Sequence, residues 1–192
     1  MLSAGGIMGA YPKVLVTGVP GVGKTALVQN IVERIKGVSA TGFTTVERQD
    51  KKGRSVMVFV NLDGREVEFA ISGKVKGKKG KRVGKYTVDV DAFEEAALEA
   101  IAFHPEFNLY IIDELGPMEA LSRMFCETAK MLLKSDKVAV LATVAKGGHG
   151  FIREIKRLPG IEMIELSGTG HEKIEDDLLI KFMTSLVKHE AQ

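Results

Sequence analysis

The stretch KVLVTGVPGVGKT, residues 13–25, constrains the fold of this chain more than any other part of its 192 residues. Its β-branched and leucine residues at 14–16 are typical of a strand buried on both faces, and Gly18 marks the end of that strand. The spacing from Gly18 to Thr25 fits G-x-x-x-x-G-K-[ST], in which glycines let backbone N–H groups turn inward to hold phosphate oxygens. We therefore predict a phosphate-binding loop.

The residues after the loop support this interpretation. Apolar residues recur at helical spacing over 27–35, and Gly37 then supplies a stop signal. The order strand, loop, helix favours a ligand-binding loop over a glycine-rich turn without a ligand. Lys24 would place its charge near the β- and γ-phosphates, Thr25 would offer a hydroxyl to Mg²⁺, and the helix would point its positive N-terminus at the same anion.

A second apolar run, residues 107–112, leads directly into Asp113 and Glu114. An apolar strand that ends in Asp is the Walker B pattern, where the carboxylate holds Mg²⁺ at the carboxyl edge of the sheet. Asp113 would serve the metal, while Glu114 would orient or deprotonate the attacking water. The alternative role for Glu114 is a helix-terminal acid stabilised by the helix dipole.

The remaining pattern predicts further strands and helices around these two segments. Alternating residues over 42–47, 55–61 and 66–71, with Asp63-Gly64 as a hairpin turn, predict an antiparallel extension whose last strand lies at the sheet edge. Residues 138–142 and 161–166 predict two more buried strands, the first ending at Thr143, which either senses the γ-phosphate or simply ends the strand. Helices are expected over 91–101, with Asp91 as the cap and Glu94 as its partner, and around 118–132 and 174–186.

Strands that alternate with amphipathic helices predict a three-layer α/β sandwich with a central, mostly parallel sheet. We expect the strand at 138 to lie between the loop strand and the Asp113 strand, by resemblance to hydrolysis-competent P-loop proteins. At 192 residues and 45% hydrophobic composition, one domain spanning 1–192 is expected, with residues 1–11 as a disordered leader.

The positive charge is concentrated in one segment, where seven Lys and Arg residues fall between Lys74 and Lys85. Removing those seven from the 27 Lys and Arg of the chain leaves 20 against 25 Asp and Glu, which is not a broadly basic, nucleic-acid-binding composition. The segment is predicted to be a mobile loop that is solvated or covers a bound triphosphate; nucleic acid binding through it is possible but not favoured.

The remaining composition bears on compartment and assembly. The single cysteine, Cys126, lies in an apolar helical pattern and is predicted to be an inert core thiol. No apolar stretch reaches the ~18 residues needed to span a bilayer, so no membrane partner is expected. We expect a cytoplasmic protein that is a monomer rather than an oligomer.

The chain resembles the small thermophilic nucleoside-triphosphatases, whose human relative is called cancer-related nucleoside-triphosphatase. The resemblance covers nearly the whole chain and is carried by GVPGVGKT, by GFTT with Glu47, by residues 83–94, VGKYTVDVDAFE, and by residues 109–125, LYIIDELGPMEALSRMF. It implies a RecA/ASCE-like P-loop NTPase fold and Mg²⁺-dependent hydrolysis of ATP, GTP, CTP and UTP to diphosphates, with broad base specificity. Two alternatives remain, a nucleotide or nucleoside kinase-like phosphotransferase and a nucleotide-controlled RNA- or protein-binding switch.

The site residues follow from the motifs and the resemblance together. The catalytic candidates are Lys24 and Glu114, and the metal candidates are Thr25 and Asp113. The nucleotide-binding candidates are Gly18, Val19, Pro20, Gly21, Val22, Gly23, Lys24, Thr25, Leu109, Tyr110, Ile111, Ile112, Asp113, Glu114, Leu115 and Gly116.

Overall fold

A computed structural model describes residues 11–73 and 80–190, with the backbone alone for 188–190. The predicted leader therefore lies outside the described residues, except for Tyr11, which packs against the core beneath α1 and α5. In chain order the elements are β1 (Lys13–Gly18), α1 (Lys24–Arg34), β2 (Ala40–Gln49), β3 (Ser55–Asn61), β4 (Glu66–Ser72), β5 (Lys81–Val83), β6 (Tyr86–Val88), α2 (Val90–Ile101), β7 (Leu109–Leu115), η1 (Glu119–Leu121), α3 (Arg123–Lys134), β8 (Ala139–Val144), α4 (Phe151–Ile155), β9 (Ile161–Leu166) and α5 (Glu172–Glu190).

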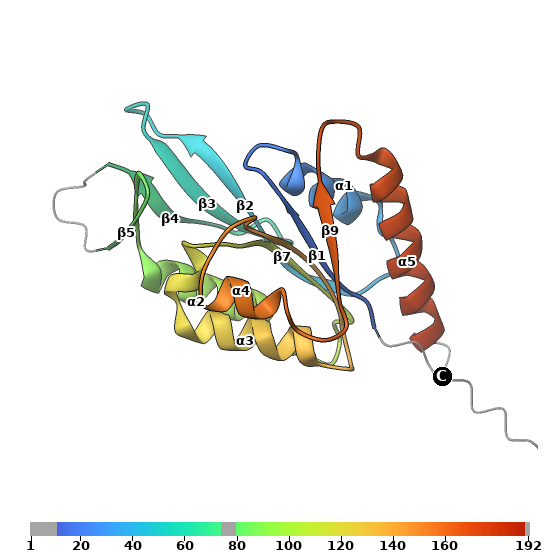
Figure 1. Ribbon diagram of the computed structural model, residues 1–192. Helices are drawn as coiled ribbons and strands as arrows, with labels where there is room; N and C mark the ends of the chain where they lie inside the picture. The colour runs from blue at the N-terminus through green and yellow to red at the C-terminus, as the bar shows by residue number, and fades with distance from the viewer. Residues whose placement is uncertain (1–10, 74–79, 191–192) are drawn as a thin grey trace, which may run out of the picture.

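The strands of the described residues form one sheet in the order β5-β6-β4-β3-β2-β7-β8-β1-β9 (Figure 1). From β2 to β9 the neighbouring strands are parallel. β8 lies between β7 and β1, as predicted. Since parallel strands end at the same edge, the loop after β1 and the carboxyl end of β7 face the same side of the sheet.

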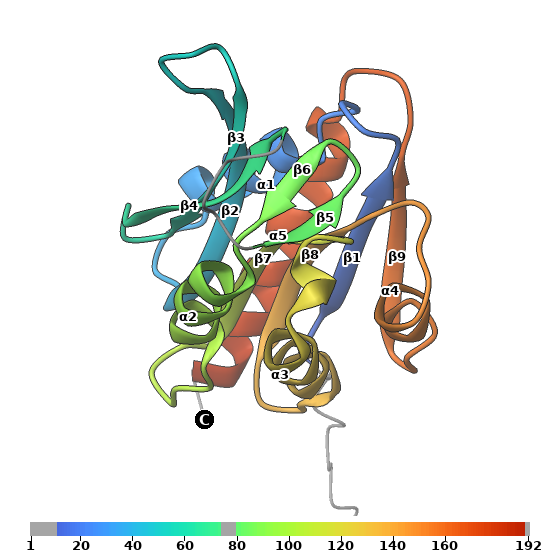
Figure 2. The same cartoon turned by 90° about the vertical axis from the view of Figure 1, so that its left-hand side faces the viewer.

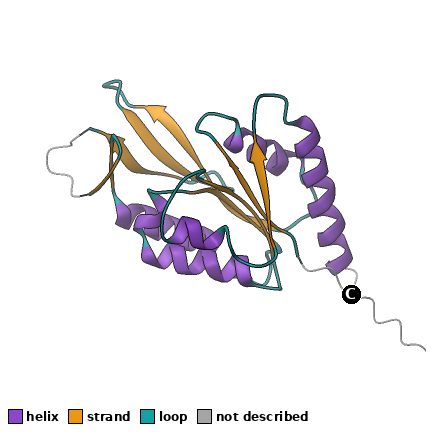
Figure 3. Ribbon diagram, viewed as in Figure 1, coloured by secondary structure: helices purple, strands orange, loops and turns teal. Residues whose placement is uncertain are grey.

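Helices cover both faces of the sheet and make the three predicted layers (Figures 2 and 3). α1 and α5 pack on one face through residues such as Ile31 and Phe182, which are both fully buried. The other face carries α2, α3 and α4 over a cluster that includes stacked rings of Phe43 and Phe59, whose centroids are 4.6 Å apart. No helix among the described residues has the length and apolar composition needed to cross a membrane.

The antiparallel extension is confirmed, but its edge differs from the prediction. β2 pairs in parallel with β7 and antiparallel with β3, and β4 follows through the predicted turn at Asp63-Gly64. β4 is not the last strand, because β6 pairs with it and β5 pairs with β6. Part of the predicted basic loop is therefore a hairpin, stabilised by burial of Tyr86 and Val88, while residues 74–79 lie outside the described residues.

The capping prediction for α2 was wrong by two residues. The helix begins at Val90, and Asp89 is the cap, because its backbone is extended and its carboxylate accepts a hydrogen bond from the Ala92 N–H at 3.2 Å. Asp91 lies inside the first turn. Glu94 accepts a hydrogen bond at 2.6 Å from the hydroxyl of Ser122, the cap of α3, so it ties the two helices together instead of completing a capping box.

Gly42 marks the closest approach between β2 and β7. Its φ is +127°, and a Cβ at this position would lie 1.9 Å from the carbonyl oxygen of Ile111 in β7. Because that contact is with backbone inside the sheet, the neighbour cannot move aside without breaking the strand pairing. The parallel pairing of β2 with β7 therefore requires glycine at this position.

We expect Gly42→Ala to lower the free energy of unfolding by about 3 kcal/mol or more, since overpacking and an unfavourable φ act together. Gly53→Ala is the matched control: its φ is +71°, but nothing lies within 4 Å of the added Cβ, so a loss of about 1 kcal/mol is expected. Urea unfolding of the two variants measures the difference. Equal losses would show that the close approach contributes nothing.

Candidate active site

The loop between β1 and α1 needs glycine at each position where the motif places it. Gly21 and Gly23 have φ of +79° and +103°, and a Cβ at Gly18 would lie 2.7 Å from the Val22 side chain and 2.9 Å from the Leu166 carbonyl oxygen. α1 begins at Lys24, and Gly23 provides no side chain to cap it. The first N–H groups of an eleven-residue helix therefore remain open toward an anion.

His171 supports this loop from outside, and sequence reasoning missed it. Its Nε2 lies 3.0 Å from the Val22 carbonyl oxygen, and its ring lies 3.6 Å from where a Cβ at Gly23 would be. The only signal in the sequence is its position directly after the turn SGTG, residues 167–170. The structure places this histidine against the phosphate-binding loop.

Asp113 ends the apolar run of β7 and is completely buried. The Thr143 hydroxyl at the end of β8 donates to its Oδ1 at 2.5 Å, so Thr143 is a partner of Asp113. Burial raises the pKa of Asp113, while the Thr143 and Thr25 hydroxyls, the Thr45 N–H and the Lys24 charge lower it. Within the described part of the chain, Oδ2 has no hydrogen-bond partner.

Glu114 follows at once and is less buried than Asp113. Its pKa is raised, mainly because burial disfavours the charged carboxylate. The Lys24 and Lys156 charges act in the opposite direction, and the Asp113 carboxylate adds to the rise. Lys24 itself is 8% exposed and stands at the first position of α1. The carboxylates of Asp113 and Glu114 and the ammonium of Lys24 are thus close enough to interact electrostatically.

A third carboxyl, Glu119, belongs to this group and was not predicted. It lies on η1, is 4% exposed, and burial together with the charges of Glu114 and Asp113 raises its pKa to about 8. A Cβ at Gly116 would lie 2.7 Å from Glu119 Oε2 and 3.6 Å from Glu114 Oε1, so the two side chains meet over that glycine. Within 11–73 and 80–190, no three acids, histidines or cysteines are arranged as a metal site.

Part of the predicted nucleotide-contacting segment is core. The side chains of Leu109, Tyr110, Ile111, Ile112 and Leu115 are 0% exposed and pack between the helical layers. Their side chains therefore offer no exposed surface to a nucleotide, and nucleotide contact at these five residues stays a prediction. They position the carboxyl end of β7, where Asp113 and Glu114 lie near Lys24.

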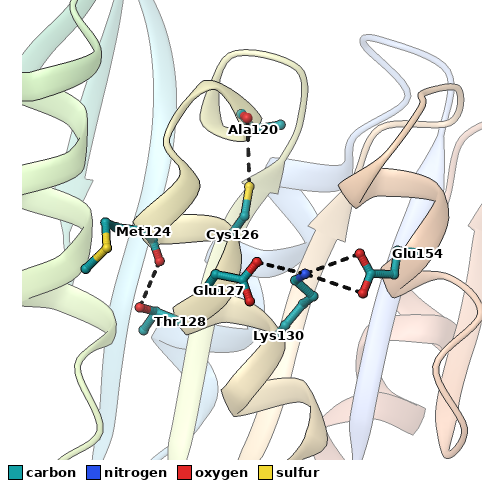
Figure 4. A network of polar contacts seen from close by, with 7 residues as sticks. All are labelled: Ala120, Met124, Cys126, Glu127, Thr128, Lys130 and Glu154. Atoms are coloured by element: carbon teal, nitrogen blue, oxygen red, sulfur yellow. Dashed lines mark hydrogen bonds and ion pairs between the residues drawn. The ribbon is translucent and has the colours of Figure 1, made fainter.

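Cys126 is the inert core thiol that was predicted. Its sulfur lies 3.8 Å from the Ala120 carbonyl oxygen, and burial raises its pKa to about 11 (Figure 4). His149 is exposed in the loop after β8 and takes no part in the group around Asp113.

The chemistry of the group follows from its members. Open N–H groups and Lys24 attract a multiply charged anion, and Asp113 with Thr25 presents oxygen atoms to a cation. Glu114, whose pKa is raised by burial, is suited to accept a proton from a water molecule. The arrangement can therefore hold a phosphate chain beside a proton acceptor.

Comparison with known proteins gives a consistent picture. A family model described as NTPase matches residues 13–179. The chain is similar to nucleoside-triphosphatase THEP1 of Aquifex aeolicus, with 38% identity over 176 residues, covering 87% of this chain and 97% of that protein. In a structural superposition the crystal structure of THEP1 from A. aeolicus has a TM-score of 0.72 and 32% identity, over 86% of this chain and 96% of that one. The solution structure of a human cancer-related nucleoside triphosphatase has a TM-score of 0.75 and 29% identity, over 91% and 98%.

Proposed function

Since this chain belongs to the NTPase family, we propose that it is a nucleoside-triphosphatase that converts nucleoside 5′-triphosphates to diphosphates and inorganic phosphate with Mg²⁺. The observation that carries the proposal is the meeting of Lys24, Asp113 and Glu114 at one sheet edge, beside the uncapped N-terminus of α1. The relatives bearing the name nucleoside-triphosphatase share most of their length with this chain.

The proposed metal site is supported by one orphaned atom. Asp113 Oδ2 is buried with no hydrogen-bond partner among the described residues, and the Thr25 hydroxyl faces the same carboxylate. A carboxylate and a hydroxyl are ligands that suit Mg²⁺, which usually completes its shell with waters and substrate phosphates. When bound, the metal would neutralise charge on the phosphate oxygens.

The protein groups would divide the remaining work. The backbone N–H groups of the phosphate-binding loop, other than at Pro20, and the Lys24 ammonium would bind and orient the phosphates. Thr143 would keep Asp113 in one orientation through its hydrogen bond. Glu114 would take the proton from the attacking water, since desolvation makes it a stronger base than an exposed glutamate.

Phosphate release from ATP, GTP, CTP and UTP, each with Mg²⁺ and with a chelator, tests the proposal. Hydrolysis of all four that stops on chelation supports it, and no release from any of them overturns it. The same reactions run with added nucleosides and nucleotides test the phosphotransferase alternative, which requires phosphate to appear on an acceptor.

Base discrimination is expected to be weak, with kcat/KM for the four triphosphates within about tenfold of one another. The groups gathered at the site are N–H groups, a lysine, hydroxyls and carboxylates, which recognise phosphate and metal. A site built to hydrogen-bond one base can discriminate by ~10⁴. A preference of that size for one base would reveal a base-binding pocket outside the residues named here.

A further inference from the structure

A basic cleft lies between the loop after β8 and α4, and none of the residues that line it belongs to the phosphate-binding loop. It has a volume of about 250 Å³ and is lined by Lys146, Gly148, Arg153, Lys156 and Arg157, among others. Four cationic residues thus line one concavity.

The two arginines of this cleft are available to a ligand. Arg153 and Arg157 are exposed, and neither guanidinium group has an ion pair or hydrogen bond with another described residue. Glu154 lies between them in sequence, but its carboxylate is paired with Lys130 of α3 at 3.2 Å (Figure 4). Glu165, whose charge acts on Lys156, is itself paired with Lys146 at 2.8 Å. The cleft therefore keeps an excess of positive charge.

Lys156 is held in place by the loop. Its ammonium donates to the carbonyl oxygens of Ala145 and Lys146 at 2.6 and 2.8 Å, which leaves one N–H available. Partial burial lowers the pKa of Lys156, and the negative charges of Glu165 and Glu114 raise it. Lys156 of the cleft is thus close enough to Glu114 of the candidate active site for their charges to interact.

We propose that this cleft is a second anion site, which binds a phosphate group independently of the phosphate-binding loop. Guanidinium forks match the oxygens of phosphate, and Arg153 on α4 and Arg157, in the turn just after it, both line the cleft. Drug-sized ligands usually occupy pockets of roughly 300–1,000 Å³. The smaller volume favours a compact anion, either inorganic phosphate or the phosphate of a monoester.

The test measures binding of inorganic phosphate by isothermal titration calorimetry in a Lys24→Ala background, which weakens binding at the loop. Adding Arg153→Gln and Arg157→Gln should reduce the affinity at least tenfold, because each removes charge-assisted hydrogen bonds. The control carries Lys134→Gln and Lys137→Gln, which remove the same charge from exposed positions outside the cleft. Its affinity should be unchanged.

Three results would overturn the proposal. The first is no binding of phosphate to the Lys24→Ala protein, the second is an unchanged affinity after the two arginine changes, and the third is a loss of affinity in the control as large as in the arginine variant. Adenosine 5′-monophosphate, titrated in the same way, separates the two sources. Tighter binding of the monoester than of inorganic phosphate assigns the site to phosphate esters, and the reverse assigns it to free phosphate. Neither outcome depends on hydrolysis.

Discussion

Lys24→Ala is expected to reduce kcat by at least ~10² and to weaken triphosphate binding, making it one of the two most damaging substitutions in the chain. The variant loses the charge nearest the phosphates in the proposed complex. It also removes the cation that lowers the pKa of both Asp113 and Glu114, so both carboxyls become harder to ionise. Steady-state phosphate release at saturating nucleotide, with equilibrium binding beside it, measures both effects.

Two controls test whether the effect of Lys24→Ala comes from misfolding or from the loss of any one positive charge. Lys36→Ala removes one cation from an exposed position just beyond α1, and its turnover should match that of the unmodified protein. Because Lys24 is buried, circular dichroism and thermal unfolding of Lys24→Ala establish that the fold is kept. Near-normal turnover in a folded Lys24→Ala protein would remove the loop from the mechanism and with it the proposed function.

The sequence could predict most of the parallel half of the fold because β1, β7 and β8 are continuous apolar runs, and the loop motif then indicated which strand ends meet. The prediction of a buried strand at 161–166 was wrong: β9 forms there, but it lies at the edge of the sheet and only Leu166 is buried. The order β7-β8-β1 needed more than periodicity, since no local pattern says which strand lies between two others. It came from resemblance to other proteins with this loop.

The β5–β6 hairpin was missed because its many basic residues obscure the alternation of buried and exposed side chains that indicates a strand. Lys81, Arg82 and Lys85 suggest a solvated loop, while only Tyr86 and Val88 carry the buried face. Tyr86 donates to Glu47 of β2 at 2.6 Å, and Lys85 pairs with the same carboxylate at 3.0 Å. Those contacts join segments almost forty residues apart, so a window along the chain cannot show them.

In the candidate active site, too, some residues could be predicted from local sequence and others could not. Lys24, Asp113 and Glu114 could be assigned because their roles follow from a motif or a strand end. Glu119 and His171 could not, because a buried acid and a loop-supporting histidine gain their significance from neighbours brought together by packing. An acid five residues after Glu114 has no local signature that separates it from a surface residue.

Glu114→Gln is expected to lower the rate of hydrolysis by ~10² to 10⁴ while triphosphate affinity changes little. Glutamine keeps the size of the side chain and one carbonyl acceptor, but it cannot take a proton. Because burial raises the pKa of Glu114, the acid limb of the kcat profile in the unmodified protein should lie above the ordinary titration range of glutamate. That limb reflects loss of the base as pH falls, so it should be absent from any residual activity of the variant.

Asp113→Asn provides the contrast that separates base from metal ligand. Its carboxylate is completely buried, with Oδ2 unpaired among the described residues, so its loss should weaken nucleotide affinity and Mg²⁺ dependence together. Single-turnover hydrolysis and equilibrium binding, run on both variants across a Mg²⁺ series, distinguish the two patterns. If chemistry in Glu114→Gln is unchanged, the proton acceptor is another group, and Glu114 contributes only its negative charge beside Lys24. If instead both variants lose affinity equally, the two acids act as one metal-binding unit and the division of roles proposed here is wrong.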